Sequence, residues 1–515
     1  MDWLFLFSSS LLAIIFLPFS LLGLRASTKP KNVSSNLPPG PRRLPIIGNI
    51  HQLVGSLPHH ALRQLAEKHG PIMCLQLGEI STIVVSSAEL AKEVLKTHDV
   101  ILAGRPAMLS SNIITYGFKD LAFAPYGEYW RQMKKIFMLE LLSAKRVESF
   151  GSIREDEVSN LIRNISSKTE SPINLSKMLS SLTIRVISKT AFGNTIEPQT
   201  FVRLVDNLSQ MLDGFCISDI FPSYKLLHLI TGEMTKLRRL HREVDCILED
   251  VISECRTNGS SGRDQGDCIV DALSKIQDQG ILQLPFTSDN IKAIVLDIFA
   301  GGSDTSSVVL QWAMAEMLKN PAALERVQTE VRQVFVNSKK IDEASLGQLR
   351  YLKSVVKETL RLHPPFPLLF PRESRERVEI DGYEIPSRTK ILVNAWAIGR
   401  DPHYWTEAEK FCPERFLDNP IDYKGTDYKY IPFGAGRRIC PGINKAITIV
   451  ELTLANLLYH FDWKLPNGLS AANLDMSEAC GAATHRKNDL YLIPTSFEHY
   501  ELLVKICPFT NFNPN

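Results

Sequence analysis

The sequence predicts a mainly α-helical protein with small β-sheets, preceded by a single N-terminal transmembrane helix. Apolar residues recur at helical spacing through most of the chain, whereas only two stretches show the β-branched, alternating pattern of strands around a turn. The third observation is an uncharged apolar run at the start of the chain. With 515 residues, 44% hydrophobic and 22% charged, the chain can bury a sizeable core.

The first predicted element is a membrane span from Trp3 to Leu24, which carries no charge and can cross about 30 Å of hydrocarbon. A cleaved signal peptide is the alternative, but Asp2 replaces the usual basic start and no convincing cleavage site follows. Basic residues follow the span, and such residues stay on the cytosolic side. We therefore expect residues 1–25 to anchor a chain that faces the cytosol.

A polar, proline-rich segment follows the anchor. Residues 26–50 contain STKPKNVSSN and LPPGPRRLPIIGN, whose prolines favour extended conformations over helix. This segment is expected to be a polar spacer and a stiff hinge. No linker divides residues 51–515, which we expect to form one catalytic domain.

Within that domain the pattern predicts two hairpins, one from Pro71 to Ser87 and one from Arg377 to Asn394. The polar segment from Arg256 to Asp267 is expected to be a mobile loop. A long helix is expected to start at Thr287 or Ser288 and to stop before Pro321. The other helices are predicted over Ala61–Lys68, Ala88–Thr97, Trp130–Leu142, Leu182–Phe192, Leu237–Cys255 and Ala322–Val336.

Charge and cysteine content narrow the function classes. A net charge of +2, without a basic tract interleaved with aromatic residues, argues against nucleic acid as a partner. The nine cysteines are scattered singly with no C-x-x-C pair, which suits a reducing compartment and suggests neither a disulfide framework nor a zinc site.

The stretch PFGAGRRICPG, residues 432–442, carries the most specific chemistry. Pro441 suits the first position of a helix, so Cys440 is expected at a helix N-terminus, where the helix end and nearby arginines lower the pKa of a thiol. Gly434 and Gly436 would let the backbone approach something flat and large. A free cysteine in a glycine-rich turn leaves this pattern unexplained, and a dinucleotide loop would need a third glycine. A thiolate offered to a bound metal cofactor fits best.

The residues Phe433, Gly436, Arg438, Cys440 and Gly442 resemble the haem-binding signature of the cytochrome P-450 superfamily, the haem-thiolate monooxygenases. The resemblance implies the P-450 fold and a haem b cofactor. Cys440 would be the axial iron ligand, favouring O–O cleavage. Arg438 would pair with a haem propionate, to which a planar guanidinium is suited.

The segment Gly301-Gly302-Ser303-Asp304-Thr305 lies inside the predicted long helix, where each glycine costs about 1 kcal/mol relative to alanine. Residues that disfavour the local secondary structure in this way tend to occur at functional sites. The resemblance implies a helix that opens over the haem, where Thr305 would hold a water or the oxygen substrate and Asp304 would relay protons. A merely structural kink is the alternative.

Glu358 and Arg361 share one helical face at i,i+3 spacing. Without context this would be a solvated pair. The resemblance implies that the pair is buried, joined by Arg415 of the PERF segment, and structural, because it fixes the loop that carries Cys440.

Weaker matches concern other haem contacts. The resemblance implies that Trp130 and Lys134 belong to a helix that reaches a haem propionate, although the family usually has arginine at the second position. Arg372 matches a further propionate contact, with a surface arginine as the alternative. Lys445 departs from the family pattern and is expected on the surface that faces the reductase.

The resemblance covers about Leu37 to Pro494. Within the family, the sequence is similar to plant microsomal members of the seventy-one clan, which oxidise terpenoids, alkaloids and phenylpropanoids. It implies a single-pass protein of the endoplasmic reticulum membrane that contacts lipid. The implied reaction inserts one oxygen atom from O₂ into a C–H bond. No NADPH or flavin motif is present, so electrons from NADPH would arrive through a separate flavoprotein, NADPH-cytochrome reductase.

By the resemblance, the substrate pocket is mostly apolar, which suits a small hydrophobic ligand and makes a sesquiterpene or diterpene the first expectation. Oxidation of an alkaloid or phenylpropanoid, a haem-thiolate isomerase or dehydratase that uses no O₂, and an inactive ligand-binding scaffold are the alternatives. Desaturation is not distinguished from hydroxylation. The expected pocket residues are Ile113, Tyr116, Phe118, Ile294, Ile298, Gly301, Leu368, Leu369, Phe370, Ala482 and Ala483.

Overall fold

The computed structural model describes residues 36–193, 217–224, 231–259, 268–280, 285–336, 341–479, 481 and 483–497. The predicted membrane span lies outside these residues. Within them, one helix, Ser288–Lys319, is long and apolar enough to cross a membrane, but most of its apolar stretch is buried inside the protein.

The mainly helical class with small sheets is confirmed. Each helix predicted within the described residues is present, with boundaries that differ by several residues at most. The helices are α2 (Pro58–His69), α3 (Ala88–Lys92), α4 (Leu109–Ile114), α5 (Glu128–Ile136), α6 (Ala144–Ser149), α7 (Gly151–Ser166), α8 (Leu175–Phe192), α10 (Ile217–Ile220), α12 (Glu233–Gly259), α13 (Ile269–Gln279), α14 (Ser288–Lys319), α15 (Pro321–Phe335), α16 (Arg350–Leu362), α17 (Ala395–Ile398) and α18 (Ile443–His460).

The strands form small sheets, and both predicted hairpins are confirmed. One sheet has the order β1-β2-β7-β4, in which β2 and β7 are parallel, and another has the order β3-β11-β8. The strand pairs β5-β6 and β9-β10 form two further small sheets among the described residues. The strands are β1 (Ile72–Leu77), β2 (Ile80–Val85), β3 (Ile173–Asn174), β4 (Arg372–Glu373), β5 (Val378–Ile380), β6 (Tyr383–Ile385), β7 (Lys390–Val393), β8 (Phe461–Lys464), β9 (Glu478–Ala479), β10 (His485–Arg486) and β11 (Tyr491–Ser496).

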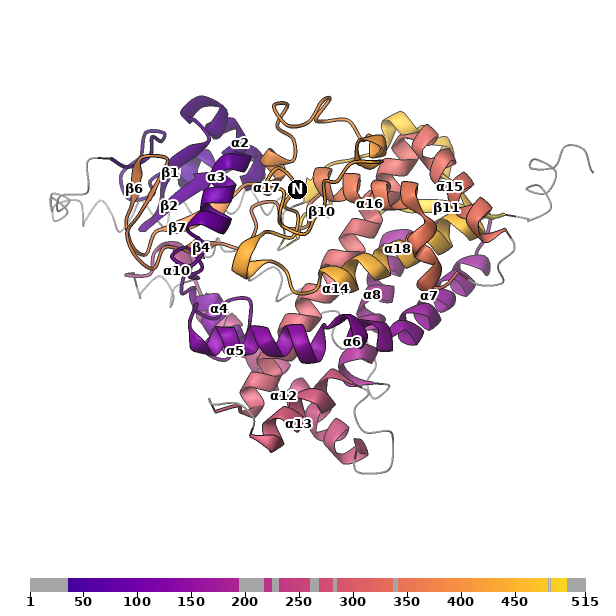
Figure 1. The fold of residues 1–515 in the computed structure, drawn as a ribbon, viewed down its shortest axis with the longest axis horizontal. Coiled ribbons are helices and arrows are strands. Elements are labelled where there is room, and N and C mark those ends of the chain that lie inside the picture. Colours follow the sequence, from indigo (N-terminus) through magenta and orange to yellow (C-terminus); the bar gives the residue numbers. More distant parts are fainter. Residues whose placement is uncertain are drawn as a thin grey trace, which may run out of the picture.

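Helix α14 is the central element. It starts at Ser288 as predicted, because Thr287 and Asn290 form a reciprocal capping box, and it ends at Lys319 before Pro321. It packs against α8, α16 and α18. Figure 1 shows α14 running between the β1-β2-β7-β4 sheet and the helices α7, α15 and α18. The first half of α14, from Ile291 to Phe299, and its second half, from Val309 to Leu318, belong to different parts of the core.

The predicted loop from Arg256 to Asp267 starts too early. Helix α12 continues to Gly259, and the Thr257 hydroxyl donates to the Ser253 carbonyl at 2.7 Å. The Thr257 hydroxyl thus bonds within the helix, where the sequence pattern predicts a loop. Residues 260–267 lie outside the described residues.

The described part of the proline-rich hinge packs against β1. The Cys74 N–H donates to the Pro39 carbonyl at 2.8 Å, and a Cβ added to Gly40 would lie 2.1 Å from the Cys74 carbonyl oxygen. The backbone contact therefore requires glycine at position 40. Pro39 and Gly40 thus contact the folded body, and the domain boundary expected at residue 51 stays a prediction.

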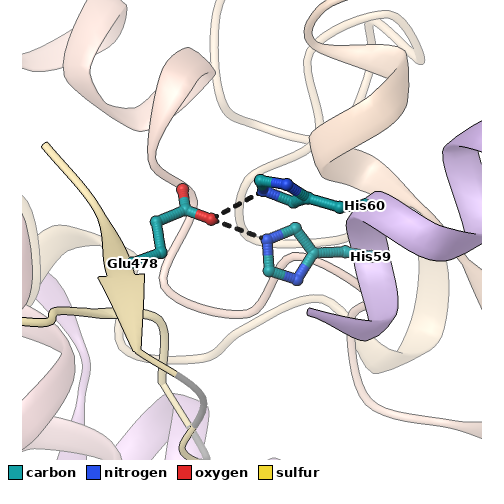
Figure 2. Close-up of side chains that lie close together, drawn as sticks. All are labelled: His59, His60 and Glu478. Atoms are coloured by element: carbon teal, nitrogen blue, oxygen red, sulfur yellow. Dashed lines mark hydrogen bonds and ion pairs between the residues drawn. The ribbon is translucent and has the colours of Figure 1, made fainter. Parts of the chain in front are cut away.

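Helix α2 is joined to β9 by the cluster shown in Figure 2. His59 Nε2 and His60 Nε2 lie 2.8 Å and 2.9 Å from the same carboxylate oxygen of Glu478. Burial lowers the pKa of His59. Burial acts to raise the pKa of Glu478, but hydrogen bonds with His363, His59 and His60 outweigh it and hold that pKa below its ordinary value.

Candidate functional site

One large cavity, with a volume of about 410 Å³, is present among the described residues. Its walls come from α5, α8 and α14 and from the loops that follow α16 and precede α18. This volume lies in the range of small-molecule sites, roughly 300–1,000 Å³. The residues predicted to touch the cofactor all line this cavity: Trp130, Lys134, Arg372, Phe433, Arg438 and Cys440.

Cys440 lies in the turn before α18. The prediction that Pro441 opens this helix is wrong, because α18 begins at Ile443 with Gly442 as its N-cap. The Cys440 N–H donates to the Phe433 carbonyl at 3.1 Å, and Cys440 Sγ accepts the Gly442 N–H at 3.4 Å. These two bonds fix the turn that places the sulfur in the cavity wall.

Burial raises the pKa of the Cys440 thiol, while the Gly442 N–H and the charge of Lys134 oppose the rise. The expectation of a lowered pKa is wrong for the polypeptide alone. The helix starts farther away than expected, and Arg438 donates to backbone carbonyls. A metal ion deprotonates a thiol that coordinates it, so a buried cysteine of this kind suits a metal ligand better than a free nucleophile.

The charge of the cavity wall fits an anionic cofactor. Burial, chiefly, lowers the pKa of Arg438 to about 9 and that of Lys134 to about 8. The pKa of Asp297 is raised well above its ordinary value, chiefly by burial and secondly by the negative charge of Asp120. The raised pKa disfavours the negative charge of Asp297. The basic residues of the wall outnumber its carboxylates, which suits the two propionates of a haem. The basic residues of the wall are Arg105, Lys134, Arg372, Lys390, Arg438 and Lys445, and its carboxylates are Asp297 and Asp304.

The two predicted propionate arginines are held in place by protein groups. Arg438 donates to the carbonyls of Ala103, Leu121 and Ala124 at 3.0, 3.1 and 2.6 Å. Arg372 is 4% exposed and binds the Asp99 carboxylate at 2.7 Å, which contradicts a surface arginine. The propionate contacts themselves remain predictions.

Trp130 and Lys134 lie beside Arg438. The Trp130 indole donates to the Leu121 carbonyl at 3.1 Å, and the Arg438 guanidinium lies 4.5 Å from the centre of the Trp130 ring. The Lys134 ammonium donates to the Arg437 carbonyl. The lysine thus contacts the cysteine loop, and its predicted propionate contact is not tested.

The two glycines before Cys440 have different roles. Both have positive φ, 71° at Gly434 and 70° at Gly436. A Cβ on Gly434, which lines the cavity, would meet only Leu369 Cδ1 at 3.8 Å. A Cβ on Gly436 would lie 2.1 Å from the Leu95 carbonyl oxygen. Gly434 therefore leaves a flat wall, whereas Gly436, contrary to expectation, faces protein backbone.

Asp304 and Thr305 line the cavity from α14, which is continuous through this segment. The Thr305 hydroxyl donates to the Gly301 carbonyl at 2.7 Å. A Cβ on Gly301 would meet nothing within 4 Å, but one on Gly302 would lie 2.5 Å from Ile187 Cδ1. The expected opening is therefore a missing side chain at Gly301, while Gly302 permits close packing of α8.

Glu358, Arg361 and Arg415 form a buried triad. Arg361 donates to both Glu358 carboxylate oxygens at 2.7 and 2.8 Å, and Arg415 Nε lies 3.0 Å from Glu358 Oε1. Arg361 also donates to the Gly399 and Ala408 carbonyls, each at 2.6 Å. The triad therefore joins α16 to the long segment that leads to the cysteine loop, and its structural role remains a prediction.

The expected substrate residues divide into two groups. Ile298, Gly301, Leu368, Leu369 and Phe370 line the cavity, whereas Ile113, Tyr116, Phe118, Ile294 and Ala483 do not. The Tyr116 hydroxyl donates to Asp245 of α12 at 3.0 Å. Ala483 packs against Val308 and Trp312. Ala482 lies outside the described residues.

Lys445 is not a surface residue, contrary to expectation. It is 8% exposed, lines the cavity, and its ammonium nitrogen is buried without a hydrogen-bond partner. Its pKa is lowered to about 7, chiefly by burial and secondly by the positive charge of Arg154. A group buried between helices cannot form part of a docking surface for a reductase.

Sequence reasoning missed Arg105 and Asp99. Arg105 donates to the carbonyls of Ala122, Phe370 and Pro371 at 2.8, 3.0 and 2.7 Å. Asp99 binds Arg372 and accepts the Arg437 N–H at 2.8 Å. Most of these partners are hundreds of residues away in sequence, and no local motif marks either position.

Comparisons with known proteins agree with this geometry. The family model described as Cytochrome P450 matches residues 38–493. The chain is 53% identical over 477 residues to desmethyl-deoxy-podophyllotoxin synthase from Sinopodophyllum hexandrum, covering 92% of this chain and 94% of the relative. It is 49% identical to premnaspirodiene oxygenase from Hyoscyamus muticus over 493 residues, covering 95% and 98%.

A solved zebra fish cytochrome P450, described as a structure with progesterone, superposes with a TM-score of 0.73 at 26% identity. The match covers 86% of this chain and all of that chain. The fold, the cavity that combines a buried cysteine with an excess of cations, and these likenesses lead to one conclusion. The chain belongs to the cytochrome P450 family and is a haem-thiolate monooxygenase whose electrons come from a redox partner reductase.

Proposed function

We propose that this enzyme hydroxylates a hydrocarbon-like plant metabolite, with a sesquiterpene or diterpene as the first candidate. The observation that carries the proposal is the apolar wall formed by Ile298, Leu369 and Phe370 beside Gly301, where α14 presents no side chain. Shape and apolar contact would orient such a ligand. The similarity to premnaspirodiene oxygenase, whose name denotes a diene substrate, supports this class.

In this proposal, one group of cavity residues binds the cofactor and another transfers protons. In the proposal, Cys440 ligates the haem iron, and the haem propionates contact Arg438, Arg372 and Lys134. The bound haem supplies oxygen activation. Thr305 and Asp304 handle protons at the cavity wall next to Gly301, where a substrate and O₂ have room.

A second substrate class has support of its own. The similarity to a synthase of desmethyl-deoxy-podophyllotoxin favours a larger, oxygenated aromatic substrate. Asp297, Arg105 and Lys390 offer polar groups in the cavity wall for such a ligand. This alternative shares the cofactor and the reaction class and differs in the ligand.

A substrate panel tests the proposal. Microsomes containing this chain and a flavoprotein reductase are supplied with NADPH and with premnaspirodiene, a diterpene hydrocarbon, an alkaloid or a lignan. We expect NADPH-dependent hydroxylation of a terpene hydrocarbon and weaker turnover of the others. Turnover of the lignan or alkaloid alone would contradict the hydrocarbon assignment.

We also propose that residues 1–25 anchor the enzyme in the endoplasmic reticulum membrane, with the catalytic domain in the cytosol and NADPH-cytochrome reductase as its partner. The uncharged run from Trp3 to Leu24, and the basic residues after it, support this topology. Deleting residues 1–25 should weaken membrane association and leave haem binding unchanged. Full membrane retention of the truncated chain would contradict a single anchor.

A further inference from the structure

Asp304 is paired with a side chain that belongs to a different element. His485 of β10 has its Nε2 atom 3.0 Å from Asp304 Oδ2. The Asp304 carboxylate lines the cavity, whereas His485 is not among the cavity-lining residues. Its side chain is nevertheless 35% exposed. The pair therefore connects the cavity wall to a partly exposed imidazole that lies behind it.

The backbone on both sides of His485 is held firmly. The Thr484 N–H donates to the Pro365 carbonyl at 2.9 Å, and the Thr484 carbonyl accepts the Trp312 indole N–H at 3.0 Å. On the other side, the Arg486 guanidinium donates to the Asp475 carbonyl at 2.6 Å, and the Lys487 N–H donates to the Ser477 carbonyl at 2.9 Å. These contacts tie β10 to α14 and to the loop after α16, so the imidazole position is set by the fold.

The neighbouring strand adds a second anchor. In the antiparallel pair of β9 and β10, Ala479 lies opposite His485 and Glu478 lies opposite Arg486. Glu478 accepts hydrogen bonds from His59 and His60 of α2, as Figure 2 shows. The strand that carries His485 is thus fixed by α14 on one side and through β9 by α2 on the other.

We propose that His485 supplies the protons that Asp304 passes into the cavity during turnover. The inference rests on the proposed function, because it assumes that Asp304 handles protons. Monooxygenation consumes one O₂, two electrons and two protons for each hydroxylated product and each water. The reductase supplies the electrons, and the protons must come from solvent.

The transfer involves ordinary acid–base steps. The N–H bond of the imidazolium at Nε2 breaks, and Asp304 Oδ2 takes the proton. The resulting carboxylic acid gives it to a water in the cavity beside Thr305, and the neutral imidazole regains a proton from solvent. Imidazole suits this role because it changes charge near neutral pH, whereas a carboxylate alone is almost fully ionised there.

The test compares His485→Asn, which keeps a hydrogen-bonding side chain but cannot titrate, with Asp304→Asn, Thr305→Ala and the His485→Asn/Asp304→Asn double variant. Each is the full chain, loaded with haem, reconstituted with the reductase and given NADPH and the panel compound that the wild type hydroxylates. Product per NADPH, hydrogen peroxide and the solvent deuterium isotope effect are measured. Substrate binding and the carbon monoxide spectrum confirm an intact site.

A second reaction separates proton supply from a structural role. An organic hydroperoxide can donate one oxygen atom to the substrate and become the alcohol, which needs neither electrons nor protons from solvent. We expect His485→Asn to lower the NADPH-driven rate about tenfold, below the roughly 10²–10⁴-fold of a direct proton-transfer group. The hydroperoxide-driven rate should change little. In the double variant, His485→Asn should add nothing to Asp304→Asn.

The outcomes are distinct. If Asp304→Asn lowers NADPH-driven turnover and His485→Asn does not, the role of His485 is overturned and the proposed function stands. Equal losses in the NADPH and hydroperoxide reactions, or additive losses in the double variant, also overturn it. If Asp304→Asn and Thr305→Ala both keep wild-type turnover and coupling, the proton path of the proposed function itself fails. His485→Gln repeats the test if the Asn variant does not fold.

Discussion

At the scale of single residues, the two buried cations Arg361 and Lys445 have opposite environments. Arg361 donates to a carboxylate and to three carbonyls, so its charge is compensated. Lys445 has no hydrogen-bond partner for its ammonium group, and burial lowers its pKa to about 7. An unsatisfied buried donor costs free energy that a compensated one does not. Lys445 should therefore destabilise the fold.

Replacing Lys445 by methionine should raise stability at pH 7 by about 1–3 kcal/mol, because it removes an unsatisfied buried group and keeps most of its volume. The folded-state pKa lies below the ordinary value of 10.5, so the unfolded chain binds more protons between about pH 7 and 10.5. Wild-type stability should thus rise with pH over this window.

The midpoint of thermal unfolding, measured at pH 7 and pH 9, checks this prediction. The wild type should gain stability at pH 9, and Lys445→Met should lose that part of the pH dependence. Lys464→Met, at an exposed position of β8, is the matched control. A lower midpoint for Lys445→Met than for Lys464→Met would show that the lysine has a stabilising partner.

At the scale of elements, the triad of Glu358, Arg361 and Arg415 joins α16 to the segment that leads to the cysteine loop. Glu358 is fully buried, and both arginines depend on it. Removing one member of a buried ion pair typically costs about 3–5 kcal/mol. Glu358→Gln should therefore lower the free energy of unfolding by about that amount and reduce haem incorporation.

The matched control is Asp418→Asn, which breaks the exposed pair with Arg350. Exposed pairs contribute about 0–1 kcal/mol, so this variant should resemble the wild type. Haem content per polypeptide and denaturant unfolding give both quantities. Equal haem content and stability in the two variants would refute a structural role for the triad.

The junction between α2 and β9 should open in acid. The pKa of His59 is lowered by burial, and that of Glu478 is held low by its hydrogen bonds. Both pKa values are lower in the folded state than in the unfolded chain, so both groups stabilise the fold when the pH is above their ordinary pKa values. This stabilisation begins to be lost as the pH falls below about 6.5, the ordinary pKa of histidine, and decreases further in the pH range where carboxylates titrate.

Hydrogen exchange of the first turn of α2, corrected for the intrinsic pH dependence, measures this effect. Protection should decrease between pH 7.5 and pH 5.5 in the wild type. In Glu478→Gln it should be lower at both values and decrease at least as much with acid, because Glu478 raises the pKa of His59 and its loss leaves burial to lower that pKa further. Protection that is unchanged by acid in the wild type would contradict the coupling.

At the scale of the whole molecule, sequence reasoning succeeds where the signal is local. The hairpins around Gly78 and Gly382, the boundaries of α14 and the cysteine loop follow from turn residues, capping and spacing within a few residues. The pairing of His485 with Asp304 could not be predicted, because the two partners are 181 positions apart in the sequence. Tertiary packing decides such contacts.

Burial also explains the errors. The predictions for Cys440 and Lys445, a lowered pKa and a surface position, rest on neighbouring residues in the sequence. Those residues indicate helix ends and charges, but they do not indicate how deeply a side chain is buried. In the structure, burial is the largest influence on the pKa of both groups. A sequence window contains little information about burial for a residue between helices that are distant in the chain.

We propose above that the Cys440 thiolate ligates a haem in this cavity. The most direct test is the carbon monoxide difference spectrum of the reduced full-length protein, compared with that of Cys440→Ser. The wild type should show the band of a thiolate-ligated haem, and the variant should lose this band together with NADPH-driven oxidation. An unchanged thiolate band in Cys440→Ser, with haem still bound, would show that Cys440 is not the iron ligand.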